Sequence, residues 1–218
     1  MMTEAGSSCS ASGLKREPTW IDVAGMFPDP KECLTAFLTV AAAEVVAGIK
    51  PANLIRIPNQ KLPCGRRMYR LWQRFGEELM SILPFTVMTM KVSEESILLL
   101  VYRIELLQRR LQGRTMQTFL ARLGYPQPLD LDAALAQLQG SFATGIPHEV
   151  GMFLGYPFKD VKGFMAQKEP TSQERGMWRI YGPAGRSLQL SNYYRSKRME
   201  MIRKLAHGQV PNQLLQAA

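Results

Sequence analysis

The uninterrupted apolar run at residues 98–101, Leu-Leu-Leu-Val, limits most strongly how this chain can fold. A strand with one face in water alternates apolar and polar residues, whereas this run has no alternation and predicts a strand covered on both faces. It belongs to the second of two β-like segments, 85–92 and 96–102, which are separated by Ser-Glu-Glu. This spacing predicts a β-hairpin in the middle of the chain.

Helical signals dominate the sequence around that hairpin. Asp29 followed by Pro30 predicts a helix start, because the side chain can cap the helix and proline suits its first position. Apolar residues at helical spacing predict a long helix over 68–82, helices over 104–139 and a last helix over 184–206.

Two short segments complete the expected sheet. Residues 54–57 favour a strand after a turn, and 176–182, Gly-Met-Trp-Arg-Ile-Tyr-Gly, favour a strand bounded by glycines. The prediction is a mainly helical α+β fold, one domain over 29–208 around a small mixed or antiparallel sheet of three to four strands. Residues 1–28 are expected to be a disordered tail, and 209–218 a loose C-terminal end.

Composition restricts the class of protein further. The 218 residues are 46% hydrophobic, and 27 Lys and Arg against 18 Asp and Glu give a formal charge of +9, which favours an acidic partner without specifying a fold. Cys9, Cys33 and Cys64 are too few and too scattered for a disulfide framework or a Cys-x-x-Cys metal site. With no secretory signal and no apolar run long enough to span a bilayer, we expect a cytoplasmic protein without membrane contact.

Residues 147–164 concentrate the unusual side chains. This stretch holds His148, one of the two histidines, together with an aromatic cluster and the sequence Gly155-Tyr156-Pro157. Glycine can adopt the left-handed conformation that ends a helix, and proline prevents the helix from continuing. The stretch therefore predicts a tight helix–corner–helix, and a second Gly-Tyr-Pro at 124–126 indicates that the corner itself is structural.

Four ordered segments of the chain resemble a known family. They are Gly-Ile-Lys-Pro-Ala-Asn-Leu at 48–54, Val-Tyr-Arg at 101–103, the stretch at 148–161, and the Gly-Met-Trp segment with the basic helix after it. The pattern is similar to the uncharacterised bacterial family called domain of unknown function 3793, over roughly residues 40–206. The resemblance implies a soluble protein, mostly found in anaerobic bacteria, and supplies no reaction.

The chain departs from that family pattern at cysteine positions. The resemblance implies a His-Cys pair where this chain has Ala41-Ala42, paired cysteines where it has Glu174-Arg175, and a cysteine where it has Lys197. If those thiols bind metal or do redox work in relatives, this chain is expected to have lost that capacity.

The family segments all fall at turns and element ends, where residues more often serve a site than a core. We therefore predict a cleft formed by the turn at Lys50, the His148 corner and the segment from Trp178 to Tyr181. Its ligand would be a small, anionic molecule, a cofactor or a protein partner. The candidate binding residues are Lys50, Asn53, Arg103, His148, Glu149, Tyr156, Asp160, Trp178 and Tyr181.

Two alternatives remain open at this point. Nucleic acid or another polyanion could bind the last helix, with cations along it and Tyr193 to stack on a base. The residues of this alternative are Arg186, Tyr193, Arg195, Lys197, Arg198, Arg203 and Lys204. The other alternative is an enzyme that uses His148 as a general acid or base. No cofactor is evident and no metal is expected, because His148, Glu149 and Asp160 lack a partner histidine.

Overall fold

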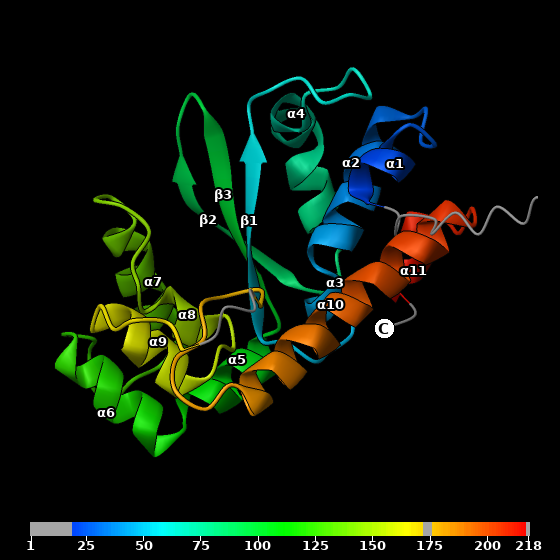
Figure 1. Ribbon diagram of the computed structural model, residues 1–218. Helices are drawn as coiled ribbons and strands as arrows, with labels where there is room; N and C mark the ends of the chain where they lie inside the picture. The colour runs from blue at the N-terminus through cyan, green and yellow to red at the C-terminus, as the bar shows by residue number, and fades with distance from the viewer. Residues whose placement is uncertain (1–18, 172–175, 217–218) are drawn as a thin grey trace, which may run out of the picture.

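The computed structural model describes residues 19–171 and 176–216, which contain a three-stranded sheet. The strands are β1 (Ala52–Pro58), β2 (Thr86–Val92) and β3 (Ser96–Tyr102). Their order is β1-β3-β2, and both neighbouring pairs are antiparallel (Figure 1). The predicted hairpin is confirmed, and so is the small sheet within a helical α+β domain.

Strand β3 lies between two hydrophobic clusters. Ile97, Leu99 and Val101 belong to the first cluster, whereas the alternate residues Leu98 and Leu100 belong to the second. Because successive side chains of a strand point to opposite faces, both faces of β3 are covered by apolar groups. The prediction drawn from the apolar run at 98–101 is therefore confirmed.

Six helices contribute to the first cluster, on one side of the sheet (Figure 1). They are α1 (Trp20–Ala24), α2 (Pro30–Ala41), α3 (Ala43–Val46), α4 (Met68–Met80), α10 (Gly185–Ala206) and α11 (Pro211–Gln216). The long helix α10 begins near the lower end of β1, beside the helices of the other side, and runs from there along α1, α2 and α3, which it contacts (Figure 1).

The second cluster is formed on the other side of the sheet by the middle of the chain. Its helices are α5 (Ile104–Leu111), α6 (Arg114–Arg122), α7 (Leu131–Ser141), α8 (Val150–Phe153) and α9 (Phe158–Met165). Figure 1 shows α8 and α9 next to the lower end of α10. The helices of the two sides thus approach each other beyond the end of the sheet.

Local sequence signals start and stop several helices as expected. The Asp29 carboxylate accepts a hydrogen bond from the Glu32 N–H at 2.8 Å, and Asp130 accepts one from the Ala133 N–H at 2.9 Å. Gly124 and Gly155 both have positive φ, 84° and 83°, in the two Gly-Tyr-Pro corners. The corner chemistry predicted from the sequence is thus present in the structure.

The prediction of a strand over residues 176–182 is wrong. The described residues 176–182 are irregular, and their backbone donors bond to side chains instead of to a neighbouring strand. The Met177 N–H donates to Ser191 Oγ at 2.8 Å, and the Tyr181 N–H donates to Asp160 at 2.9 Å. These side-chain acceptors satisfy the backbone groups that a sheet would otherwise have paired.

The ends predicted to be tails differ from the structure where it describes them. Helix α1 lies within the range 1–28 and buries Val23 and Ala24. Helix α11 lies within 209–218, contacts α2 and buries Leu214 and Leu215. Short apolar segments were sufficient to dock both ends, whereas residues 1–18 lie outside the described residues. None of the helices in the described part of the chain combines the length and hydropathy that crossing a bilayer requires.

Candidate functional site

A pocket of about 600 Å³ opens beside helices α8 and α9. We call it the aromatic pocket, because rings form much of its wall. Its lining includes His148, Tyr156, Val161, Phe164, Trp178 and Arg179. The His148 corner and the irregular segment around Trp178 therefore come together, as the sequence predicted for two of its three loops.

The rings lie in two pairs around the aromatic pocket. Tyr156 and Trp178 are stacked, with centroids 4.6 Å apart and planes inclined by 23°. His148 and Phe164 meet edge to face at 4.8 Å and 72°. The guanidinium carbon of Arg179 lies 6.0 Å from the centroid of the Phe164 ring. A ligand in the aromatic pocket would meet flat π surfaces and one cation.

Two glycines shape the corner that presents Tyr156. Gly155 turns the chain with φ 83°, and the Tyr156 N–H donates back to the Gly151 carbonyl at 3.0 Å. A Cβ at Gly151 would lie 2.9 Å from Val161 Cγ2 and 3.1 Å from Tyr156 Cδ2. Glycine at 151 therefore permits the close approach that places Tyr156 and Val161 on one wall.

Arg110 of α5 holds the same corner by hydrogen bonds to its backbone. Its guanidinium donates to the Tyr156 carbonyl at 2.7 Å and also to the Met152 carbonyl. The Met152 carbonyl lies in α8 and the Tyr156 carbonyl lies just after the corner, so these two hydrogen bonds hold the end of the helix and Tyr156 together. Arg110 was not among the residues predicted from the sequence, because its partner segment is 42 to 46 residues away.

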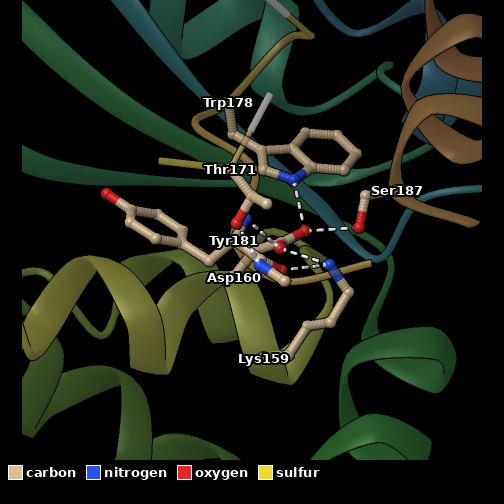
Figure 2. Close-up of polar contacts among 7 residues, drawn as sticks. Lys159, Asp160, Thr171, Trp178, Tyr181 and Ser187 are labelled. Carbon is tan, nitrogen blue, oxygen red and sulfur yellow. Dashed lines mark hydrogen bonds and ion pairs between the residues drawn. The ribbon is translucent and has the colours of Figure 1, made fainter. Parts of the chain in front are cut away.

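Asp160 organises the segment that carries Trp178 (Figure 2). One carboxylate oxygen accepts from Lys159 Nζ at 2.7 Å and from the Tyr181 N–H at 2.9 Å. The other accepts from Trp178 Nε1 at 2.9 Å and from Ser187 Oγ at 2.6 Å. A single buried carboxylate thus joins α9, the irregular segment and α10.

These donors also keep Asp160 charged. Burial by itself raises the pKa of a carboxyl group, but hydrogen bonds from Lys159, Ser187, the Tyr181 backbone and Trp178 lower the pKa of Asp160 below its ordinary value. Because four protein donors already bond its oxygens, Asp160 orients the indole of Trp178 and offers little to a ligand.

Lys50 lies behind the ring of Tyr156 instead of in the aromatic pocket. Its side chain is 2% exposed, and its ammonium is 5.2 Å from the ring centroids of both Tyr156 and Tyr194. It donates a hydrogen bond to Asn53 Oδ1. Burial lowers the pKa of Lys50 to about 8, despite the opposing attraction of the Glu44 carboxylate.

Glu44 is the buried anion to which this cluster is connected. Asn53 Nδ2 donates to one Glu44 oxygen at 2.7 Å, and Arg198 Nη2 pairs with the other at 2.9 Å. Asn53 and Arg198 therefore share one fully buried carboxylate, and Lys50 is connected to it through Asn53. A glutamate inside the apolar stretch 41–46 was the sequence signal for this network, but it does not reveal the partners.

The other predicted residues do not line the aromatic pocket. Glu149 accepts a hydrogen bond from the Tyr125 hydroxyl at 3.2 Å, and the Tyr181 ring packs directly over Gly163. Arg103 donates to the Val46 carbonyl at 2.8 Å and lines a different cavity, between α4 and the start of α5. Two of the three predicted loops therefore form the aromatic pocket. Lys50, from the third loop, lies on the far side of the Tyr156 ring and does not line the pocket.

The family model described as "Protein of unknown function (DUF3793)" matches residues 38–215. The chain belongs to the DUF3793 family. No curated protein and no solved structure matches it. The matched range contains the aromatic pocket and every candidate residue named above, so the site lies inside the DUF3793 region.

The basic helix of this DUF3793 chain engages several of its cations internally. Arg198 pairs with buried Glu44, while Lys197 and Lys204 both pair with Glu200, at 3.0 and 2.8 Å. The Tyr193 ring lies 6.0 Å from the Lys197 ammonium. Arg186, Arg195 and Arg203 are exposed, and polyanion binding by this helix stays a prediction.

His148 is exposed at the aromatic pocket and packs against Phe164. Within 19–171 and 176–216, no side chain forms a hydrogen bond with its ring, and no three His, Cys, Asp or Glu residues gather as metal ligands. A general acid or base is usually oriented by such a hydrogen bond. The acid–base role therefore stays a prediction.

Several lining residues of the pocket were not predicted from the sequence, among them Arg179 and Phe164. Arg179 lies inside the Gly-Met-Trp segment, and Phe164 ends the stretch that carries the corner, yet neither was selected. Alternation along an expected strand would have pointed Arg179 away from Trp178. Only the irregular backbone allows both neighbours to line one pocket.

Proposed function

We propose that this protein binds a small molecule with a flat aromatic ring and an anionic group in the aromatic pocket. The observation that supports the proposal is the combination of ring walls with one exposed guanidinium, that of Arg179. This proposal is more specific than the prediction from the sequence, which was an accessory protein that binds a small anionic ligand, a cofactor or a protein partner. A cytoplasmic location is part of the proposal.

The size and the walls of the pocket favour a ring compound. Small-molecule sites usually enclose roughly 300–1,000 Å³ and are lined by apolar and aromatic groups with a few polar ones. The aromatic pocket has about 600 Å³ and includes Tyr156, Phe164 and Trp178. Rings in proteins prefer offset stacking or edge-to-face contact, and both geometries are offered here.

The charge at the pocket favours an anion. Asp160 is the one carboxylate among the described residues of the lining, and its oxygens already accept four hydrogen bonds. Arg179 contacts the Phe164 ring, and no carboxylate of the described residues pairs with it. A guanidinium can bond a carboxylate, sulfonate or phosphate through two N–H groups.

The test uses two fluorescent probes that differ in one group. The probe 1-anilinonaphthalene-8-sulfonate carries the anion, and N-phenyl-1-naphthylamine is the same ring system without it. We expect both probes to bind and to quench Trp178, with the sulfonate bound more tightly. Arg179→Gln should weaken the sulfonate about fivefold and leave the neutral probe unchanged, since a partly exposed charge contact contributes about 1 kcal/mol.

Matched variants locate the binding. Phe164→Ala should weaken both probes, because it removes a ring from the wall, whereas Arg109→Gln makes the same charge change on exposed α5 and should affect neither. Equal affinity of Arg179→Gln and Arg109→Gln for the sulfonate would contradict the anionic part of the proposal. If Phe164→Ala binds both probes as tightly as wild type, the proposal that they bind in the aromatic pocket is contradicted.

A further inference from the structure

Cys33 and Cys64 are 31 positions apart in the sequence and lie in neighbouring parts of the fold, because Arg66, two residues after Cys64, lies against the Cys33 sulfur. Cys33 lies in the first turn of α2 and is fully buried, whereas Cys64 lies in the connection between β1 and α4 and is half-buried. Cys64 packs against the hydrophobic cluster that contains Cys33. Both are free thiols in this structure.

Arg66 holds the connection over Cys33. One guanidinium nitrogen lies 3.8 Å from the Cys33 sulfur, and the other donates to the Pro28 carbonyl at 2.9 Å, just before α2. The Leu62 N–H donates to the Arg66 carbonyl at 2.8 Å and closes the loop around Cys64. The Arg66 cation favours the thiolate form of Cys33, against the effect of burial, and so assists Cys33 when this thiol reacts.

We propose that Cys33 and Cys64 form a redox pair that a peroxide converts to a disulfide. The disulfide would link the β1–α4 connection to the start of α2. The site is separate from the aromatic pocket, so it does not depend on the ligand-binding proposal.

Exposure assigns the order of the two steps. The Cys64 thiolate attacks one peroxide oxygen and the O–O bond breaks, which gives a sulfenic acid on Cys64. The hydroxide that leaves takes up the proton released by the Cys64 thiol and becomes water. Cys33 then attacks the Cys64 sulfur: the S–S bond forms, the S–O bond breaks, and the Cys33 proton leaves with hydroxide as a second water. In total two thiols lose two electrons and two protons, and one hydrogen peroxide becomes two waters.

Burial is consistent with Cys33 as the second reactant. Loss of solvation raises the pKa of Cys33 to about 11, although the Arg66 cation acts in the opposite direction. Cys33 therefore stays a protonated thiol near neutral pH, shielded from peroxide, until a sulfenic acid forms beside it.

The test uses the full chain with Cys9→Ser, which leaves two thiols. After hydrogen peroxide and then N-ethylmaleimide, digestion without reductant should give one peptide pair joined through Cys33 and Cys64, lighter by two hydrogens and separated by dithiothreitol. In Cys33→Ser, dimedone should trap a sulfenic acid on Cys64 instead. Separate peptides, with Cys64 overoxidised or alkylated in the folded protein, would overturn the proposal.

Arg66 provides a second, kinetic test. Arg66→Ala should slow the attack of Cys33 on the Cys64 sulfenic acid about tenfold at pH 7, with partial recovery in Arg66→Lys and less difference at high pH, because Arg66 stabilises the negative charge that develops on the Cys33 sulfur in this second step. Arg67→Ala is the matched control, since Arg67 donates to the Asn59 carbonyl at 3.0 Å and not to a thiol. Equal rates and equal pH profiles for Arg66→Ala and Arg67→Ala would contradict the role of Arg66.

Discussion

The indole nitrogen of Trp178 donates a hydrogen bond to the Asp160 carboxylate at 2.9 Å, so a wall of the aromatic pocket is anchored to a buried charge (Figure 2). Asp160 is 2% exposed and holds α9, α10 and the segment between them through the same group. The shape of the pocket and the stability of this part of the fold therefore depend on one side chain.

Asp160→Asn should lower the free energy of unfolding by about 3 kcal/mol, because an amide nitrogen would face groups that are all donors. Urea denaturation checks this value. Asp132→Asn, an exposed change in the first turn of α7, is the control and should cost less than about 1 kcal/mol. Equal losses for the two variants would show that the Asp160 hydrogen bonds contribute little.

The same carboxylate predicts acid sensitivity. The pKa of Asp160 is lowered in the folded state. Its contribution to the free energy of unfolding is therefore fully present above the unfolded pKa of 3.8 and is lost as pH falls through the folded pKa. Wild type should therefore lose stability below about pH 4 more steeply than Asp160→Asn. Parallel acid denaturation curves for the two proteins would contradict the assignment.

Lys50 predicts a change in the alkaline range. Its pKa falls from 10.5 to about 8 on folding, so the unfolded chain binds more protons between these values and stability rises with pH there. Below pH 8 the buried charge costs roughly 3 kcal/mol. Urea denaturation at pH 7.5 and 9.5 should show this rise in wild type and a smaller one in Lys50→Met. Glu44 and Arg198 remain in the variant, so an unchanged slope would exclude Lys50 as its source.

Arg198 should be the most important cation of α10 for stability. Arg198→Gln leaves the Glu44 carboxylate, 0% exposed, without its ion pair, and we expect a loss of about 3 kcal/mol in urea denaturation. Lys204→Gln removes an exposed pair with Glu200 and should change stability by less than about 1 kcal/mol. If both variants unfold alike, the buried network does not hold α10 in place.

Two helical glycines should respond oppositely to alanine. A Cβ at Gly163 would lie 2.4 Å from Tyr181 Cγ, whereas at Gly140 no atom lies within 4 Å. Gly163→Ala should therefore destabilise by about 1–3 kcal/mol through overpacking. Gly140→Ala should stabilise by about 0.5–1 kcal/mol through helix propensity. Thermal unfolding of both variants measures the difference, and stabilisation by Gly163→Ala would mean that Tyr181 moves freely.

Local chemistry in the sequence determined the elements and the general fold. The apolar run at 98–101 required cover on both faces of β3, and Asp29, Asp130 and Gly155 set helix ends through contacts within five residues. These features depend on neighbouring residues and on burial patterns. Both can be recognised in a single sequence.

Only the tertiary structure decided which side chains share a site. Asp160 meets Trp178 and Ser187 across 18 and 27 positions, Lys50 lies behind Tyr156, and Arg66 meets Cys33 across 33 positions. The irregular backbone at 176–182 follows from such contacts, because a buried carboxylate and a serine satisfy its N–H groups in place of a strand. Long-range partners of this kind leave no periodicity in the sequence, so packing alone determines the aromatic pocket.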